Sequence, residues 1–392
     1  MSSTRLLIID NQHHGLAPLT HLRPSFDLRT GAWTTRQRIE RVLGLEAAAL
    51  FVWGPHWGLV KETQGVAGVQ LIDSLTDTVS AGRWYVVGSG CASPQVLEQL
   101  KSLAPQHVIR EPCGAWVAAH LELPRETELA WLWDDERWNA KAVILDHSVL
   151  VRQPWHILGQ LEATLAYDLA HMTRRADSAA VHASAVIDET RGPVVIDHGA
   201  IVGALSFLQG PCYIGAHTEV APHAYIRPHT VVGPYCKVAG EISFSIIQGY
   251  TNKAHQGYLG HSLLGQWVNL GAGTTVSNLK NTYGSVRVQR RLDEPEEDTG
   301  RQFCGPIIGD YVRTAIGSRL LTGACLNTGA MIALSGFAPK CARTLGFYTD
   351  EHPEGQAYDL AKFVETARAM MARREVDLGP ELEGRLRELA TE

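Results

Sequence analysis

Aliphatic residues recur at every sixth position through the middle of the chain. Eight successive steps carry one without exception, namely Ile196, Val202, Leu208, Ile214, Val220, Ile226, Val232 and Val238. Glycine or alanine follows the aliphatic residue at five of these steps. A period of six fits neither the 3.6 residues of an α-helix nor the two residues of a β-strand. It is typical of a parallel β-helix, in which each repeat supplies one short strand and one corner.

The first 150 residues show a different pattern, in which strand-like and helix-like segments alternate. Short apolar runs predict strands over 5–9, 47–53, 83–87 and 107–110, and amphipathic spacing predicts helices over 34–45 and 94–103. Thr34 with Gln37 has the spacing of a capping box, and Ser93 is a good N-cap for the second helix. Such alternation favours an α/β domain over residues 1–150, with a parallel, doubly wound sheet.

Two further segments have helical spacing. Ile157, Leu161, Leu165 and Leu169 lie on one face of a helix over 153–175, which predicts a helical linker at 151–180 between two bodies. The β-helix is then expected over 181–345. A helical tail at 346–392 follows, with a helix over 359–389 that is interrupted at 377–380.

Composition narrows the class of protein. The 392 residues are 45% apolar and 19% charged, which excludes wholesale disorder, and the net charge of −6 argues against a dedicated nucleic-acid binder. No apolar run approaches the roughly 20 residues that span a bilayer, and the four-residue run at 6–9 is too short for a signal peptide. Seven cysteines without a Cys-x-x-Cys pair fit reduced thiols and a cytoplasmic location.

The six-residue phase lapses between Val238 and Leu264, and polar residues gather there around His255. A regular solenoid that is interrupted once, around a histidine, is the place to look for chemistry. Acyl transfer to an amine needs a base with a pKa near 7, and imidazole meets that need.

The repeat resembles that of the hexapeptide-repeat, left-handed β-helix acyltransferases. In that family three hexapeptides form one triangular coil, so that residues 18 apart stack. His217, His223 and His229 recur every six residues, which suggests either a metal cluster or three corner residues. In a triangular coil they would point from three different faces, and we therefore expect corner residues.

The segment in which the six-residue phase lapses resembles one particular family more closely. Residues 253–260 (KAHQGYLG) and 268–274 (VNLGAGT) closely resemble the acetyltransferase domain of bifunctional N-acetylglucosamine-1-phosphate uridyltransferase. The resemblance implies that His255 is the general base and that Glu241 is the carboxylate that orients it. It also implies acetyl-CoA, or another acyl-CoA, as cosubstrate and a homotrimeric assembly.

The same resemblance implies further contacts with the two substrates. Tyr258 and Arg227 would contact the sugar phosphate, and Asn278 and Asn269 would also bind the acceptor substrate. On the acyl-CoA side, the implied contacts are Ala272, through its backbone, and Lys280.

The chain also departs from that family. The second phosphate-binding lysine of the family falls at Ser243, and the aspartate after its Tyr-Leu-Gly falls at His261. An insertion rich in arginine and acidic residues, Val286–Arg301, follows Asn278. These differences concern the acceptor sugar rather than the fold.

The N-terminal half lacks the Gly-rich phosphate loop of the ordinary enzyme. Several segments instead resemble a divergent group of sugar nucleotidyltransferases that is fused to the same β-helix. They are residues 18–31, the helix start at 34–36, and the downstream segments 249–250, 278–281 and 302–305. Arg23 and Arg29 are apt phosphate ligands, because a guanidinium fork matches phosphate oxygens. Asp27 either holds a magnesium ion or pairs with an arginine inside the domain.

The leading hypothesis is therefore a sugar-nucleotide enzyme like those of UDP-N-acetylglucosamine biosynthesis. Its N-terminal domain would transfer a nucleotidyl group from a nucleoside triphosphate to a sugar 1-phosphate with Mg²⁺, and its β-helix would N-acylate an amino sugar phosphate. One alternative is a thymidylyl- or uridylyltransferase whose β-helix is only an oligomerisation or regulatory platform. A second is a non-enzymatic, carbonic-anhydrase-like β-helix scaffold with histidines at a trimer interface. No membrane or nucleic-acid partner is expected.

Overall fold

The computed structural model describes residues 4–11, 14–64, 68–134 and 136–391. The chain forms two compact units. The first consists of Met1–Leu16 and Arg23–Gln153, and the second of Ala17–Leu22 and Pro154–Glu392. Helix α4 (Pro154–Ala170), which was predicted from its spacing, belongs to the second unit.

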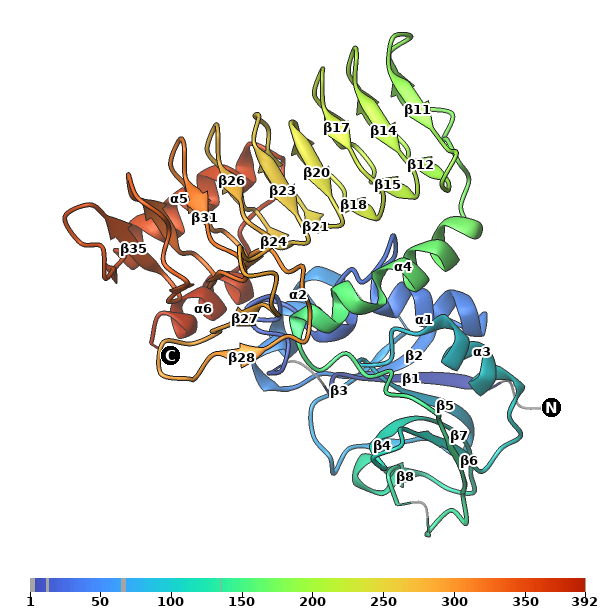
Figure 1. Ribbon diagram of the computed structural model, residues 1–392. Coiled ribbons are helices and arrows are strands. Elements are labelled where there is room, and N and C mark those ends of the chain that lie inside the picture. The colour runs from blue at the N-terminus through green and yellow to red at the C-terminus, as the bar shows by residue number, and fades with distance from the viewer. Residues whose placement is uncertain (1–3, 12–13, 65–67, 135, 392) are drawn as a thin grey trace. The chain divides into compact units, whose positions relative to one another are not determined.

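A seven-stranded sheet forms the centre of the first unit (Figure 1). Its order is β3 (Gln70–Ile72), β2 (Ala47–Phe51), β1 (Arg5–Ile9), β5 (Gly82–Gly88), β7 (Trp116–Leu123), β6 (His107–Arg110) and β9 (Lys141–Ile144). The four strands predicted from apolar runs are all present. The prediction of a wholly parallel sheet is wrong, because β7 pairs antiparallel with both β5 and β6. β7 is eight residues long and was not recognised, since its near-continuous burial gives no alternating pattern.

The helices of the first unit begin where the sequence predicts. Helix α1 (Thr35–Leu43) starts with a complete capping box between Thr34 and Gln37, and α3 (Pro94–Ser102) is capped by the Ser93 side chain. Helix α2 (Trp57–Gln64) follows β2. A short antiparallel pair, β4 (Thr78–Val79) and β8 (Thr127–Glu128), completes the described strands of the unit.

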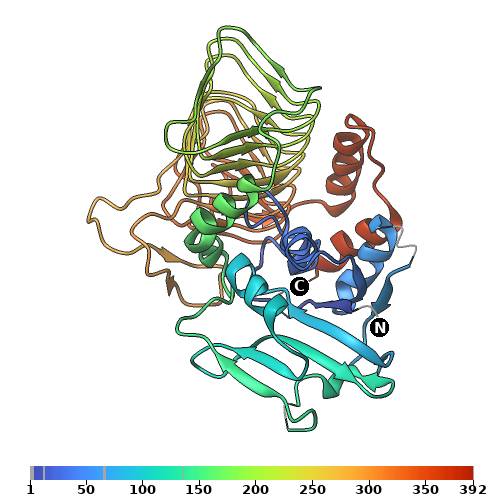
Figure 2. The ribbon, with the colours of Figure 1, turned by 90° about the vertical axis from the view of Figure 1, so that its right-hand side faces the viewer.

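The second unit contains a three-sided parallel β-helix, whose stacked coils are seen in Figures 1 and 2. The ten-stranded face consists of β10 (Ala180–Val181), β13 (Ile201–Val202), β16 (Glu219–Val220), β19 (Lys237–Val238), β22 (Asn252–Lys253), β25 (Asn269–Leu270), β30 (Arg313–Thr314), β33 (Met331–Ala333), β35 (Gly346–Thr349) and β36 (Gln356–Ala357). The five-stranded face consists of β11 (Val186–Asp188), β14 (Phe207–Gln209), β17 (Tyr225–Ile226), β20 (Glu241–Ser243) and β23 (Tyr258–Gly260).

The eight-stranded face consists of β12 (Val194–Ile196), β15 (Cys212–Ile214), β18 (Thr230–Val232), β21 (Ile246–Gly249), β24 (Leu263–Gln266), β29 (Ile307–Ile308), β32 (Cys325–Leu326) and β34 (Cys341–Ala342). A separate parallel pair is formed by β26 (Thr275–Val276) and β31 (Arg319–Leu320), and an antiparallel hairpin by β27 (Arg287–Val288) and β28 (Glu297–Asp298). The aliphatic residues of the six-residue repeat fill the interior of the coils. The parallel β-helix predicted from the repeat, and the left-handed form that the family resemblance implies, are confirmed.

The lapse in the repeat is a change of coil length and not a break in the β-helix. Stacked partners are 18 residues apart in early coils, as in Ile201 and Glu219. They are only 15 apart for Lys237 and Asn252 and 17 apart for Asn252 and Asn269. The strand register continues through this region, so shorter corners alone shift the phase.

The three histidines that recur every six residues are corner residues, as expected. His217, His223 and His229 have φ angles of 55°, 60° and 59°, which is the left-handed conformation that tight corners require. Within the described ranges, no group of three or more His, Cys, Asp or Glu side chains is placed to hold a metal ion.

The C-terminal tail forms α5 (Leu360–Ala372) and α6 (Pro380–Leu389), in agreement with the predicted interruption. Both helices pack on an apolar cluster that includes Trp267 and Tyr311 of the β-helix corners and Leu22 of the Ala17–Leu22 segment. Arg374 fixes the end of α5 by donating to the carbonyl of Tyr235 and to the Asn252 side chain, at 3.1 and 2.8 Å. Among the described residues, no helix is long and apolar enough to cross a membrane.

Candidate functional site

Four of the predicted site residues meet on or beside the five-stranded face. Stacking places Tyr225, Glu241 and Tyr258 side by side on β17, β20 and β23. Arg227 Nη1 donates to Glu241 Oε1 at 2.8 Å, and Asn278 Nδ2 donates to the Tyr258 hydroxyl at 2.9 Å. The acceptor-binding residues Arg227, Tyr258 and Asn278 therefore lie together, although 51 residues separate the first from the last.

His255 and Ala272 lie at one edge of the same face. His255 lies in the corner between β22 of the ten-stranded face and β23 of the five-stranded face. Ala272 lies one coil later, between β25 of the ten-stranded face and β26, which pairs with β31. The two corners touch at Gly257, where a Cβ would lie 2.1 Å from the carbonyl oxygen of Thr274 and φ is 125°. The predicted base and the predicted acyl-CoA contact thus follow each other along one edge of the β-helix.

Glu241 is not joined to His255 by any hydrogen bond or ion pair of the described residues. Its carboxylate pairs with Arg227, whose side chain is 43% exposed, and the His255 side chain is exposed at the corner. The structure therefore gives Glu241 a direct contact with the predicted phosphate-binding arginine, whereas its orienting role toward His255 remains a prediction.

The sequence analysis gave no role to Lys253, which lies 15 residues after Val238 and so outside the six-residue phase. It occupies the interior position that Val238 occupies one coil earlier, and its side chain is only 2% exposed. Its Nζ donates to the carbonyl of Ala239 at 3.0 Å and to that of His255. This buried ammonium holds the corner that carries His255, and burial lowers its pKa to about 8.

Replacing this lysine by methionine, Lys253→Met, should change how stability depends on pH. The folded pKa of about 8 lies below the ordinary 10.5, so the unfolded chain binds more protons between these values and the parent gains stability as the pH rises. The methionine variant lacks this gain, which amounts to at most about 3 kcal/mol. Urea unfolding of both proteins at pH 7 and pH 10.5 measures it. A difference between them that does not vary with pH would contradict the prediction.

His261 lies at the opposite edge, at the corner between the five-stranded and eight-stranded faces. Its ring stacks between Phe244 and Phe303, at centroid distances of 4.7 and 5.1 Å. Burial, together with the charges of Arg301 and Arg227, lowers its pKa to about 4, so the imidazole is neutral near pH 7. Its Nδ1 is 2.8 Å from Asn278 Nδ2.

That contact fixes the orientation of the Asn278 amide. With Nδ2 directed to both Tyr258 and the neutral His261, the amide oxygen is left as an acceptor. The sequence analysis did not assign a role to His261. The only signal available was its departure from the aspartate of the related family.

Two predicted residues lie away from this group. Asn269 is on the outer side of the ten-stranded face, between Asn252 and Arg313 of the neighbouring coils. Lys280 lies in the loop after β26 and donates to the carbonyl of Ser285 at 3.1 Å. Their predicted contacts with acceptor and acyl-CoA remain predictions.

In the first unit, the predicted phosphate ligands surround the short 3-10 turn Ser25–Asp27. Arg29 is 9% exposed, and its guanidinium donates to the carbonyl of Ala32. Burial raises the pKa of Asp27 to about 6, against the opposing charges of Arg36 and Arg23. Asp27 could therefore pair with an arginine, since two arginines lie near its carboxyl. Its place at the end of the turn also leaves the prediction of a magnesium ligand open.

Asp10 is a second acidic residue here that the sequence analysis missed. It follows β1 directly, is fully buried, and accepts hydrogen bonds from the backbone and hydroxyl of Ser25. Ser25 also lies 2.6 Å from Ser89, which follows β5. The turn is therefore fixed at the ends of β1 and β5, where α/β sheets bind ligands.

The described residues of this region do not form a closed metal site. Mg²⁺ is commonly held by one or two carboxylates together with water and substrate phosphates. Asp27 fits that partial arrangement, whereas the arginines beside it would repel a metal ion unless an anion came with it.

The chain was compared with protein-family models and with curated proteins. Residues 6–177 match the family model described as sugar nucleotidyl transferase. The bifunctional protein GlmU of Gloeobacter violaceus is 31% identical over 122 residues, which cover 31% of this chain and 23% of that protein. The GlmU of Bifidobacterium longum subsp. infantis is 28% identical over 260 residues, covering 63% and 49%.

A third relative has a broader name. The bifunctional sugar-1-phosphate nucleotidylyltransferase/acetyltransferase of Sulfurisphaera tokodaii is 32% identical over 144 residues, covering 36% of this chain and 35% of that protein. The matched regions span less than half the length of each of these relatives. The chain therefore carries a sugar nucleotidyl transferase domain at residues 6–177 with a left-handed β-helix after it, and it resembles bifunctional sugar-1-phosphate nucleotidylyltransferase/acetyltransferases.

Proposed function

We propose that this protein is a bifunctional transferase of sugar-nucleotide synthesis. Its first unit transfers a nucleotidyl group from a nucleoside triphosphate to a sugar 1-phosphate with Mg²⁺, and its β-helix transfers an acetyl group from acetyl-CoA to an amino sugar phosphate. The products are those of a UDP-N-acetylglucosamine type of pathway, and the protein acts in the cytoplasm. The family match of residues 6–177 and the names of the relatives support both halves of this proposal.

The observation that carries the acyl-transfer half is the group of side chains on the five-stranded face. Arg227, Tyr258 and Asn278 offer a cation, a hydroxyl and an amide oxygen to one ligand, which suits a phosphorylated sugar. His255 lies at the adjacent edge of this face, and Ala272 lies one coil farther along that edge. A platform that serves only for assembly would not need these groups together.

The proposed chemistry uses His255 as the base. The amino group of the sugar attacks the thioester carbonyl carbon, a C–N bond forms, and the C–S bond breaks with release of the CoA thiolate. His255 Nε2 or Nδ1 takes the proton from the amine nitrogen and returns it to the departing thiolate. Binding of the acceptor by Arg227 and Tyr258 would hold the amine near this corner.

A substrate panel tests both halves in one experiment. The full chain is incubated with sugar 1-phosphates and nucleoside triphosphates, and pyrophosphate release is measured. In parallel, CoA thiol release is measured with acetyl-CoA and amino sugar phosphates. Thiol release with an amino sugar phosphate is the expected result. Pyrophosphate release without thiol release from any acceptor would leave the β-helix as an assembly platform.

The arginines of the first unit should act only in the nucleotidyl half. We expect Arg23→Ala to weaken binding of nucleoside triphosphate or sugar 1-phosphate at least tenfold and to leave thiol release unchanged. Arg29→Ala should do the same but also destabilise the unit, because the buried Arg29 supports the Ala32 carbonyl. Calorimetric titration with the triphosphate measures the effect. Parental affinity in both variants would make the two arginines structural.

The assembly is expected to be a homotrimer. The resemblance of the repeat to the hexapeptide-repeat acyltransferases supports this proposal, and a trimer would place the edge with His255 and Ala272 beside a second subunit. Multi-angle light scattering at the concentration of the activity assay should give three times the 42.9 kDa of the chain. A monomer at that concentration would count against an acyl-CoA site shared between subunits.

A further inference from the structure

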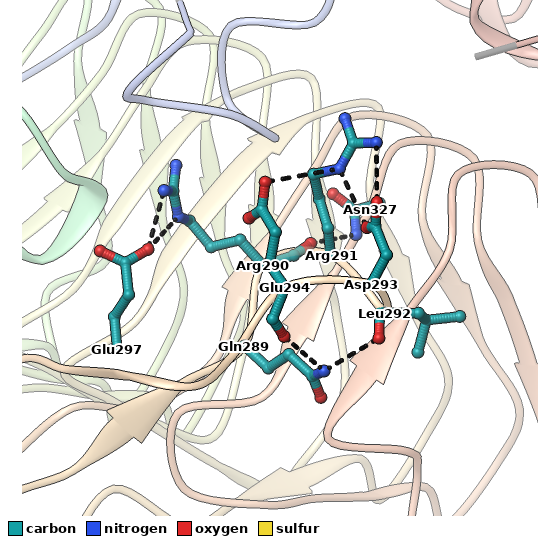
Figure 3. Close-up of polar contacts among 8 residues, drawn as sticks. All are labelled: Gln289, Arg290, Arg291, Leu292, Asp293, Glu294, Glu297 and Asn327. Carbon is teal, nitrogen blue, oxygen red and sulfur yellow. Dashed lines mark hydrogen bonds and ion pairs between the residues drawn. The ribbon is translucent and has the colours of Figure 1, made fainter.

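The insertion Val286–Arg301 is fixed to the β-helix and forms the hairpin β27–β28. Asn327, which follows β32, donates to the carbonyl of Arg290 at 2.9 Å, and a Cβ on Gly323 would lie 2.6 Å from Val286 (Figure 3 shows the Asn327 contact). Val286 and Val288 are fully buried. The hairpin is therefore a built part of the second unit, with a defined position relative to the coils.

The arginines of this insertion divide into two kinds. Arg287, Arg290 and Arg291 pair with acidic residues of the insertion itself, at 3.5, 2.8 and 3.2 Å, and Figure 3 shows the last two pairs. Arg301, at the end of the insertion, has no ion pair or side-chain hydrogen bond among the residues that the structure describes. Its Nε is buried without a partner.

Arg301 is held against the corner that carries His261. Its Nη1 lies 3.4 Å from the position of a Cβ on Gly159, in the middle of α4. Two residues later Phe303 stacks on His261 at 5.1 Å, and the amide of Cys304 donates to the carbonyl of Asn278 at 2.9 Å. Burial lowers the pKa of Arg301, and the charge of Arg301 in turn contributes to the low pKa of His261.

Two further nitrogen atoms on the same edge of the β-helix, two coils earlier, also lack a hydrogen bond within the described part of the chain. Arg227 Nε and His229 Nδ1 are buried without a hydrogen bond, as Arg301 Nε is. Glu162 of α4 is the acidic side chain whose charge acts on Arg301. It is 68% exposed, and its carboxylate lies 3.9 Å from His229 Nε2. Buried guanidinium donors without acceptors are costly, so the unpartnered Nε atoms of Arg301 and Arg227 on one edge of the β-helix indicate a missing anion.

We propose that Arg301 is an anion-binding residue of the β-helix site and that, with Arg227, it holds the phosphate group of the acceptor sugar. The proposal rests on the proposed acyl-transfer function for the identity of the sugar. The phosphate contact is argued from the unpartnered Arg301 Nε, from the packing of Arg301 on α4 and from the place of Arg227 on the same edge. Ser243, on the coil between Arg227 and His261, carries no charge, so the insertion supplies the second cation from a distant part of the sequence.

Binding of inorganic phosphate to the full chain tests the contact without any turnover. We expect Arg301→Gln and Arg227→Gln each to weaken one binding event at least tenfold in calorimetric titration. The double variant should lose little more than either single variant, because both residues act on one ligand. Arg291→Gln is the matched control, since that arginine is 61% exposed and paired within the insertion, and it should bind as the parent does.

Kinetics with acetyl-CoA give the second readout. The Michaelis constant for glucosamine 1-phosphate should rise at least tenfold in Arg301→Gln with kcat changed less than threefold, whereas the constant for acetyl-CoA should not change. Arg301→Lys, which keeps the charge, should recover part of the phosphate affinity. Phosphate binding without thiol release would refute the acyl-transfer proposal and leave the contact intact.

Parental phosphate affinity in a folded Arg301→Gln protein would overturn the inference. Independent effects of Arg301→Gln and Arg227→Gln on two separate binding events would also overturn it. Folding is not expected to interfere, because removing an unpaired buried charge should leave the melting temperature equal or higher.

Discussion

His255→Ala should reduce the turnover of acetyl transfer at least about 100-fold and leave nucleotidyl transfer unchanged. A general base contributes typically 10²–10⁴-fold in rate, and the His255 side chain is exposed, so its loss should cost the fold little. The affinity for acetyl-CoA should change little, so the loss appears in kcat. Thiol release and pyrophosphate release, measured on the same preparation, separate the two activities.

The β-helix offers a matched control for this substitution. His223 is also exposed and occupies the same kind of corner, two coils earlier, with a φ of 60°. His223→Ala should therefore keep full activity. His261→Ala should raise the Michaelis constant for the acceptor by releasing Asn278. If His261→Ala is inactive and His255→Ala is active, the assignment of the base is wrong.

Glu111→Ala should lower the free energy of unfolding of the first unit by about 3 kcal/mol or more. The Glu111 side chain is fully buried, and it accepts from the amides of Val149 and Leu150, both at 2.7 Å. Arg152 donates to its other oxygen at 2.5 Å. Truncation leaves these donors without an acceptor, which is the costly case for a buried pair. Urea unfolding followed by tryptophan fluorescence measures the loss.

The pH dependence of that loss follows from the pKa of Glu111. Burial raises this pKa, but the hydrogen bonds from Leu150, Arg152 and Val149 outweigh burial and hold it below the ordinary 4.5. The Glu111 carboxylate therefore contributes fully to the free energy of unfolding above pH 4.5. This contribution is lost as the pH falls through the lower pKa of the folded state. Glu122→Ala is the control, because that carboxylate is 53% exposed in its pair with Arg83 and should cost less than about 1 kcal/mol. Equal losses in the two variants would contradict the prediction.

The sequence by itself determined the β-helix and most elements of the first unit. A six-residue aliphatic period admits few structures, because each repeat must turn one side chain into a narrow interior. Local signals were equally sufficient for the starts of α1 and α3, where capping depends only on residues three positions apart. The hydrophobic pattern did not predict β7 or its antiparallel direction, since the direction of a buried strand depends on the sheet around it.

Only the tertiary structure decided which polar residues share a site. The resemblance drew attention to His255, Tyr258 and Asn278, but spacing could not show that His261 contacts Asn278 across 17 residues or that Arg301 lies beside α4. Coils of 15 to 17 residues shift the corners, so residues that are neighbours in space follow no fixed interval in the chain. Lys253 is a further case. It lies 15 residues after Val238, outside the six-residue phase, so only the coil that encloses it shows that its side chain is interior and donates to the His255 carbonyl.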